Sequence, residues 1–429
     1  MSSLLLLFFP LLISLVSAAS AFLAPKSFVK VHHRAFSSHA FEAADSRLCA
    51  ATQTLIVGKI ILDKYGPPDR QTDDDGVTIG GGGPQSAWGA AASLVVRDYL
   101  SRTEKKKIND TTNNNDDERD FLLSNPKHQI TFLAPVGTKN WTPSMTEQLT
   151  QLLPPMVVVV LVPSEDHITP TINIWHDENE TVRWMPVDGS FDDIGADGLW
   201  QNRPSAQDIL SAIKDTDDDD IILHAIIESG SKPAGKGLDA LPFFDDKLMS
   251  KVSTAGVEPI VFADEVSGKV TEEDSQAVTT TISKIRQSYV HARACDKEKD
   301  DNSLFVVTPD RPCYEGLISH TNLTMDESEN TENNEFEMII RDGGNGCFTN
   351  EMKMPAATLR TIDKAPVNPT GAGNAFSAAY VVCRGTGSSM KEAASIATAV
   401  GAVVCEYEHL PPWSLEVVER IAEAACEVL

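Results

Sequence analysis

The stretch Asn368-Pro369-Thr370-Gly371-Ala372-Gly373-Asn374, continued by Ala375-Phe376-Ser377-Ala378-Ala379-Tyr380, is the most informative part of this sequence. Because glycine has no Cβ, the backbone at Gly371 and Gly373 can approach an anion closely, and the N–H groups of Gly371, Ala372 and Gly373 can point at it. The Ala-rich continuation is typical of a helix that runs to Gly385. Such a helix start offers free N–H groups and the positive end of the helix dipole, so the pattern predicts a phosphate-binding turn. The alternative is an ordinary strand-to-helix turn without a ligand.

Glycine-rich turns also occur elsewhere in the chain. Gly80-Gly81-Gly82-Gly83-Pro84-Gln85-Ser86-Ala87 precedes another Ala-rich segment, and the run Leu55-Ile56-Val57-Gly58 upstream of it leads to Asp63. Gly343-Gly344-Asn345-Gly346 follows a predicted strand. Beyond the first motif, the capping box Ser389-Met390-Lys391-Glu392 opens a further helix.

The body of the chain alternates between short apolar runs and helical patterns. The predicted strands, rich in Val and Ile, are 54–61, 129–136, 156–162, 221–227, 259–262, 304–307 and 337–341. Helical patterns between them lie at 144–153, 206–214 and 272–292. Runs with little polar alternation are typical of strands buried on both faces. The order predicts an α/β fold with a mostly parallel central sheet and helices on both sides.

Two kinds of segment depart from this alternation. Residues 171–177 and 181–185 alternate apolar and polar side chains, which predicts an antiparallel hairpin with one solvated face. Residues 101–120, a low-complexity insert, and residues 296–303 and 325–335 are polar and rich in Asn and Asp. We expect these three to be inserted, poorly ordered loops.

The charge and the cysteines exclude several classes of partner and site. The chain has 429 residues, with 36 Lys and Arg against 62 Asp and Glu, which gives a net charge of −26. Such a surface repels phosphate backbones and anionic lipids, so general binding to nucleic acid or to a membrane surface is not expected. The seven cysteines are scattered and form no C-x-x-C pair. This spacing argues against a disulfide framework and structural zinc, and it predicts buried free thiols.

The first 48 residues have the character of a targeting sequence. An apolar stretch of about 13 residues, from Leu4 to Val16, has the length of a signal-peptide core, and small residues follow it. We therefore expect a signal peptide at 1–21 and, in the basic segment that follows, a transit peptide at 22–48. Ala19-Ser20-Ala21-Phe22 resembles the cleavage motif of two-part presequences in algae with complex plastids, which implies delivery to the plastid (chloroplast). Secretion is the alternative, and after processing no membrane contact is expected.

From about residue 52 to its C-terminus, the chain resembles the pfkB (ribokinase-like) family of carbohydrate kinases. The family begins with a Gly-Gly-x-Gly-x-Asn type signature, matched at 80–85, and ends with an Asp-Thr-x-Gly-Ala-Gly-Asp type signature, matched at 368–374. It also carries an Asp five residues after the glycine of its first strand, as Asp63 follows Gly58. Residues 404–411 resemble the closing segment of a eukaryotic branch related to the yeast maintenance-of-killer protein. The resemblance implies a ribokinase-like three-layer α/β/α domain at 49–429, with a small β lid near 165–186.

The resemblance also implies roles for individual residues. Asp63, with Gly82, Gly83 and Gln85, would contact the substrate, Asp63 by accepting hydrogen bonds from sugar hydroxyls. Gly371, Ala372 and Gly373 would form the anion hole that stabilises charge on the transferred phosphoryl group. Gly343 and Gly346 would form the turn beside the nucleotide, and Asn374 stands at the position of the catalytic base. The implied ligands are ATP with Mg²⁺ and a small sugar or polyol, and pairing of lids implies a homodimer.

Asn374 and the metal motif depart from the family pattern. An amide has no useful basicity near neutral pH, so Asn374 cannot take a proton from the attacking hydroxyl. Asn368 replaces an acid common at the start of the signature. The family's Asn-x-x-Glu motif, linked to its metal, is matched only by the segment from Thr308 to Glu315, with Asp for Asn and the Glu displaced. The metal ligands are therefore unassigned.

Three functions are compatible with this pattern. The first is an ATP-dependent kinase of a sugar or polyol, weakened by the loss of its base. The second is a pseudokinase that binds nucleotide or sugar without turnover. The third is a protein that keeps the fold as a scaffold for a plastid complex, because fold alone does not give function.

Overall fold

The computed structural model divides the chain into two units, Met1–Glu42 and Ala43–Leu429. It describes residues 53–65, 77–109, 128–176, 182–187, 205–213, 221–229, 236–237, 244–261, 270–294, 303–320, 334–361 and 366–429, all of them in the second unit. The predicted signal and transit peptides lie outside the described residues, as do residues 110–120 of the low-complexity insert and most of the polar segments 296–303 and 325–335.

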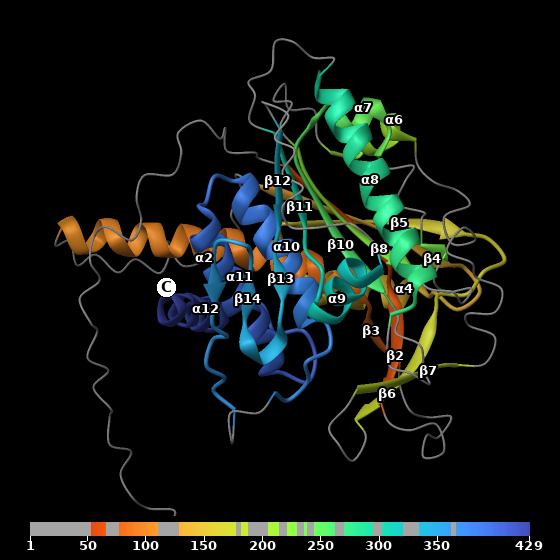
Figure 1. Cartoon of the computed structure of the whole chain (residues 1–429). Coiled ribbons are helices and arrows are strands. Elements are labelled where there is room, and N and C mark those ends of the chain that lie inside the picture. The colour runs from red at the N-terminus through yellow and green to blue at the C-terminus, as the bar shows by residue number, and fades with distance from the viewer. Residues whose placement is uncertain are drawn as a thin grey trace, which may run out of the picture. The chain divides into compact units, whose positions relative to one another are not determined.

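Seven of the described strands form a parallel sheet in the order β12-β11-β10-β8-β1-β4-β5 (Figure 1). Their bounds, in chain order, are β1 (Gln53–Val57), β4 (Gln129–Gly137), β5 (Val157–Ser164), β8 (Ile221–Ser229), β10 (Val252–Val261), β11 (Ser303–Val307) and β12 (Asn334–Met338). The two-residue strand β9 (Lys236–Gly237) pairs antiparallel with β8. The strands β1 and β11, each with a neighbouring strand on both sides, are buried along their whole length, which explains their mostly apolar sequences. The α/β prediction with a mostly parallel sheet is confirmed.

A second, four-stranded sheet has the order β3-β2-β6-β7. It contains β2 (Ile61–Tyr65), β3 (Thr78–Gly80), β6 (Thr171–His176) and β7 (Val182–Pro186). β6 and β7 are antiparallel, as the alternating pattern predicted, while β2 and β6 are parallel. A third small sheet joins β13 (Ile340–Arg341), β14 (Cys347–Phe348) and β15 (Lys353–Met354).

Two predicted strands are in fact divided between sheets. The run 54–61 was expected to be one strand, but β1 ends at Val57 and β2 begins at Ile61 in the second sheet. The break falls at Gly58, where a Cβ would lie 2.7 Å from the Cα of Gly83. Similarly, the run 337–341 is shared between β12 and β13. Apolar residues continue across both breaks, so hydrophobicity alone did not reveal them.

Two groups of helices cover the central sheet, one on each face (Figure 1). One group contains α2 (Gly82–Asn109), α10 (Ala372–Gly385), α11 (Met390–Cys405) and α12 (Leu415–Val428). The other contains α6 (Ala206–Ala212), α7 (Asp246–Met249), α8 (Glu272–Ala294) and α9 (Arg311–His320). α4 (Pro143–Leu152) connects β4 to β5. Because α2 continues to Asn109, the first nine residues of the segment 101–120 are helical, and the expectation of a loop there was wrong.

Side chains from alternate positions of the strands form two hydrophobic layers. Leu55, Leu223 and Val257 face the group of helices that includes α8, where they pack in one core with Ile285 and Tyr289. On the opposite face α10 lies close to β10, because a Cβ on Gly256 would lie 2.4 Å from Val381. Cys313, Cys347 and Cys383 are buried thiols, as predicted, whereas Cys405 and Cys426 are only partly buried. Burial raises the pKa of Cys347 and Cys383 to about 11.

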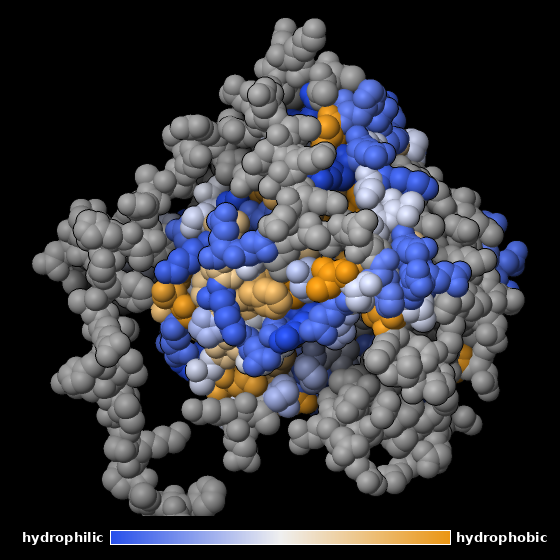
Figure 2. Space-filling model, viewed as in Figure 1, coloured by the Kyte–Doolittle hydropathy of each residue, from blue (hydrophilic) through white to orange (hydrophobic). Residues whose placement is uncertain are grey.

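Hydrophilic side chains and small hydrophobic areas alternate on the face shown in Figure 2. Among the described residues, the exposed large hydrophobic side chains are only Tyr65, Val158, Ile318 and Val367. The helices in the described part of the chain include none that is both long and apolar enough to span a membrane.

Candidate active site

The starts of helices α2 and α10 meet beyond the carboxyl end of β1. The side-chain amide of Asn374 donates a hydrogen bond from Nδ2 to Gln85 Oε1 at 2.9 Å. The Ser86 hydroxyl donates to the Asn374 carbonyl oxygen at 3.3 Å. Both helices direct their N-terminal N–H groups and their positive dipole ends to this region. In open α/β sheets, this edge is where ligands bind.

The turn at Gly371 has the geometry of an anion-binding helix start. Gly371 precedes the first residue of α10 and has φ +84°, a left-handed conformation that favours glycine. A Cβ at Gly371 would also lie 2.0 Å from the Gln85 side chain. The Ala372 N–H donates to the Pro369 carbonyl at 3.2 Å, so it is already engaged. In the described part of the chain, the N–H groups of Gly371, Gly373 and Asn374 have no backbone acceptor, which leaves them available to a ligand.

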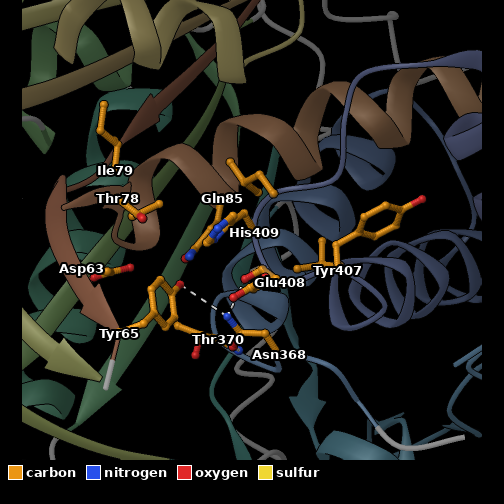
Figure 3. Close-up of a pocket in the computed structure, with 13 residues that line it drawn as sticks. Asp63, Tyr65, Thr78, Ile79, Gln85, Asn368, Thr370, Tyr407, Glu408 and His409 are labelled. Carbon is orange, nitrogen blue, oxygen red and sulfur yellow. Dashed lines mark hydrogen bonds between the residues drawn. The ribbon is translucent and has the colours of Figure 1, made fainter. Parts of the chain in front are cut away.

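A polar pocket adjoins this turn (Figure 3). β2 and β3 supply Asp63, Tyr65, Thr78, Ile79 and Gly80, the start of α2 supplies Gln85, and the 368–374 motif supplies Asn368 and Thr370. The remaining lining residues are Val404 in the last turn of α11 and, from the segment after that helix, Tyr407, Glu408, His409 and Leu410. Gln85 therefore both lines the pocket and contacts Asn374, which connects the pocket to the start of α10.

Asp63 is the main ionisable group of the pocket. It pairs with Thr78 across β2 and β3, and only 2 % of its surface is exposed. Its carboxylate lies against Gly80, where a Cβ would come within 1.9 Å of Oδ2. Desolvation raises the pKa of Asp63 from 3.8 to about 7. Hydrogen bonds from a bound ligand would offset this desolvation, which is the condition expected of a carboxylate that binds hydroxyl groups.

Contacts between β2, the 368–374 motif and the segment after α11 join the lining residues of the pocket. Asn368 Nδ2 donates to the Glu408 carbonyl at 2.7 Å and to the Tyr65 hydroxyl at 3.4 Å, and Asn368 Oδ1 accepts from the Thr370 N–H at 3.0 Å. The rings of Tyr65 and His409 lie 5.5 Å apart. The amide of Asn368 therefore uses both its donor and its acceptor, which a carboxylate could not do.

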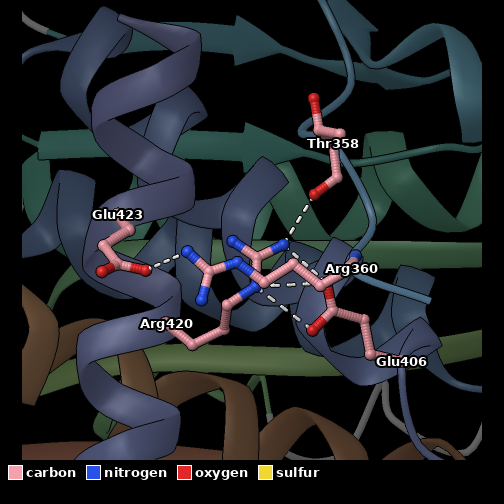
Figure 4. A network of polar contacts seen from close by, with 5 residues as sticks. All are labelled: Thr358, Arg360, Glu406, Arg420 and Glu423. Atoms are coloured by element: carbon pink, nitrogen blue, oxygen red, sulfur yellow. Dashed lines mark hydrogen bonds and ion pairs between the residues drawn. The ribbon is translucent and has the colours of Figure 1, made fainter. Parts of the chain in front are cut away.

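An ion-pair network fixes the base of the segment after α11 (Figure 4). Arg420 on α12 donates to Glu406 and, through Nη2, to the Thr358 carbonyl at 2.6 Å. Glu406 also accepts the backbone N–H of Arg360 at 2.8 Å, and Arg360 pairs with Glu423. These contacts fix the position of Glu406, the residue before Tyr407, which lines the pocket.

A charged cluster lies beneath the start of α10. Arg341 Nη1 is 2.9 Å from Glu258 Oε1, and Glu258 Oε2 is 3.5 Å from His224 Nε2. The side chains of Glu258 and His224 are fully buried, and that of Arg341 is 12 % exposed. A Cβ on Gly373 would lie 2.1 Å from Arg341 Nη1. The sequence offered one hint of this cluster, since Arg341 precedes the 343–346 glycine turn by two residues.

The other predicted site residues lie in different surroundings. Gly82 is the first residue of α2, where a Cβ would lie 3.2 Å from Asn374 Nδ2. Gly83 packs against Phe132, and its N–H donates to the Lys59 carbonyl at 3.0 Å. Neither lines the pocket. Gly343 begins an exposed 3-10 turn (Gly343–Asn345), and the buried Gly346 follows it with φ +92°.

The described residues do not form a ready magnesium site. Asp310 accepts the Cys313 N–H at 2.8 Å, and Glu315 is exposed and paired with Arg311. The described residues contain no group of three His, Cys, Asp or Glu side chains placed to hold a metal ion. The residues present therefore do not fit a protein-held Mg²⁺, and a divalent ion would enter mainly on the phosphates of the nucleotide.

Comparisons with known proteins agree with this fold. Residues 305–411, about a quarter of the chain, match the profile described as pfkB family carbohydrate kinase. The nucleoside kinase of Burkholderia thailandensis, solved with inosine, has a TM-score of 0.50 at 14% identity and covers 86% of this chain and 98% of its own. Ribokinase from Thermotoga maritima has a TM-score of 0.47 at 15% identity, and the match covers 86% of this chain and 99% of that ribokinase. Arabidopsis thaliana ribokinase, solved with ribose and ATP, has a TM-score of 0.47 at 11% identity, and the match covers 87% of this chain and 99% of that ribokinase.

The comparisons define the fold class. Among curated proteins, no sequence is significantly similar to this chain. At 10–15% sequence identity, the likeness to the solved structures establishes the fold alone. This likeness and the matched segment, which contains the 343–346 and 371–374 turns, together show that the chain has the ribokinase-like α/β fold of the pfkB carbohydrate kinases.

Proposed function

We propose that this protein transfers a phosphoryl group from ATP to a hydroxyl of a sugar or sugar-like polyol. One observation supports the proposal most strongly: the hydrogen bond between Asn374 and Gln85 joins an anion-binding helix start to a pocket that contains a buried carboxylate. The helix start suits the phosphates, and Asp63 suits the hydroxyl groups of the acceptor.

The pocket favours an uncharged acceptor. Asp63 and Glu408 are among its lining residues, and the described lining contains no Lys or Arg. A sugar that already carries a phosphate would meet acidic groups without a compensating cation. A polyol hydroxyl, in contrast, can donate to the Asp63 carboxylate and return its pKa toward the ordinary value. The acceptor class that follows is a non-phosphorylated sugar or polyol.

The chemistry can proceed without a carboxylate at position 374. The acceptor hydroxyl oxygen forms a bond to the terminal phosphorus while the bond from that phosphorus to the bridging oxygen breaks and ADP leaves. In a loose transition state little negative charge builds up on the attacking oxygen, so its proton can leave late, to the new phosphoryl group and then to water. The protein positions the reactants and stabilises charge at Gly371 and Gly373. Loss of the base lowers the rate by about 10²–10⁴-fold.

Asn374 also supports a second candidate, a pseudokinase. Its amide donates to Gln85, so in this arrangement it occupies the base position with a group that cannot accept the hydroxyl proton. A pseudokinase would bind the same nucleotide and polyol without forming ADP.

Calorimetry with uncharged polyols and their phosphorylated counterparts tests the proposal. We expect a panel of pentoses, hexoses and alditols to contain a ligand, and its phosphate ester to bind at least about 10-fold more weakly. Asp63→Asn should weaken binding of the polyol. Preferential binding of the phosphate ester would contradict the acceptor class, and binding of MgATP without ADP formation on any acceptor would favour the pseudokinase.

A further inference from the structure

Arg341 places a cation at the side of the first turn of α10. A Cβ on Gly373, the second residue of that helix, would overlap Nη1 of the guanidinium, at 2.1 Å. The arginine backbone is anchored, because its N–H donates to the Pro309 carbonyl at 3.0 Å and β13 pairs with β14. The position of the guanidinium is thus set by the sheet and by the lack of a side chain at Gly373.

This position brings a cation next to the first turn of a helix. The start of α10 carries the positive end of the helix dipole, which repels the guanidinium. Glu258 offsets part of this repulsion from below, at 2.9 Å from Nη1. Two positive groups nevertheless converge on one place, and an anion bound there would stabilise both.

The cluster beneath has unused hydrogen-bonding capacity. Nε of Arg341 is buried without a hydrogen-bond partner. Both carboxylate oxygens of the fully buried Glu258 also lack an aligned hydrogen bond, although each lies near a cation or ring nitrogen. Among these groups only the Nε–H of Arg341 is a donor, so it is the one that a bound anion can satisfy, whereas the Glu258 oxygens are acceptors that face the arginine and His224.

We propose that Arg341 is a catalytic residue that binds the terminal phosphate of the nucleotide at the start of α10, and that Glu258 is a positioning residue behind it. The inference rests on the proposed function, since it assigns a role within the same site. A guanidinium can donate two parallel hydrogen bonds to a phosphate, and it remains charged throughout the reaction. Stabilising charge on the transferred group compensates in part for the missing base at Asn374, whose neutral amide does not compete with the phosphate for Arg341.

Titration calorimetry of the full chain with MgATP, MgADP and adenosine tests this assignment. We expect Arg341→Met to lower the affinity for MgATP by about 10-fold or more, because the terminal phosphate loses its charged donor. The affinity for MgADP should fall by less, and the affinity for adenosine should not change. Arg341→Lys keeps the charge but lacks the planar guanidinium, so its affinity for MgATP should lie between those of Arg341→Met and the parent. The matched control is Arg293→Met, which removes a partly exposed arginine in the last turn of α8, where it contacts the Val252 carbonyl at the first residue of β10, and should change none of the three affinities.

Glu258→Gln distinguishes positioning from a merely structural role. Alone, Glu258→Gln should lower the affinity for MgATP moderately. Added to Arg341→Met it should cause no further loss, because Glu258 acts only by positioning the arginine. Additive losses would overturn the positioning role. Equal MgATP affinity in the parent and in Arg341→Lys and Arg341→Met, with circular dichroism confirming folded proteins, would overturn the inference alone. Failure of the parent to bind any nucleotide would overturn the proposed function and this inference with it.

Discussion

Replacing Asp63 by Asn should change how stability depends on pH. Burial raises the pKa of Asp63 from 3.8 to about 7, and only 2 % of the residue is exposed. The folded protein therefore binds this proton more tightly than the unfolded chain does. The stability that protonation contributes is fully present below about pH 4 and is lost as the pH rises through about 7. Over the whole range, the loss is on the order of 4 kcal/mol, at about 1.4 kcal/mol for each pKa unit.

Urea unfolding of the parent and of Asp63→Asn between pH 5.5 and 8.5 measures this effect while avoiding the sequence pI of about 4.7. Within that range the parent should lose roughly 2 kcal/mol relative to the variant, most of it below pH 7.5, because the site is still half protonated near pH 7. Asn keeps the shape of Asp and removes the buried charge. Asp208→Asn is the control: hydrogen bonds to Ser205 lower the pKa of that exposed carboxyl below its ordinary value, so its contribution to stability is lost only in acid and stays constant between pH 5.5 and 8.5. A free-energy difference between parent and Asp63→Asn that stays constant with pH would refute the reasoning.

Three further predictions address the site and the presequence. Asn374→Asp should raise the rate of phosphorylation of a bound polyol by roughly 10²-fold, because it restores a proton acceptor to which Gln85 can donate after turning its amide. A coupled ADP assay measures this rate, and a slower variant would mean that the amide serves another mechanism. Asn368→Asp should lower the free energy of unfolding by about 1–3 kcal/mol, because a carboxylate cannot donate to the Glu408 carbonyl, and unchanged urea midpoints would contradict this. A fluorescent protein fused to residues 1–45 should reach the plastid in an alga with a complex plastid, and Phe22→Ala should hold it outside, whereas export to the medium would support secretion.

The phosphate-binding turn and the helix behind it could be predicted because their signal is local. Gly371 requires a left-handed backbone, and the residues behind it are small and apolar, so seven consecutive positions define the turn. Asp63 and Gln85 could be placed near that turn only through the family resemblance, since their proximity depends on the pairing of β2 with β3 and on contacts with α10.

The charged cluster could not be predicted from the sequence. Glu258 lies inside a strand that was expected to begin at residue 259, and its partners come from β8 and β13, over thirty residues away on one side and over eighty on the other. Such pairs arise from the order of strands in the sheet, which no local pattern encodes. The same holds for Asn368, whose replacement of an acid was noted in the sequence, while its contact with Glu408 required the structure.

The measurement that tests the central claim most directly is phosphorus NMR of the full chain with MgATP and the polyol that calorimetry identifies. The account predicts a new phosphomonoester signal that grows as the terminal phosphate signal of ATP declines. In Gly373→Val it should be absent, because the added side chain overlaps Arg341. ATP that binds but stays intact for hours, with every bound polyol and in the Asn374→Asp variant as well, would contradict a kinase.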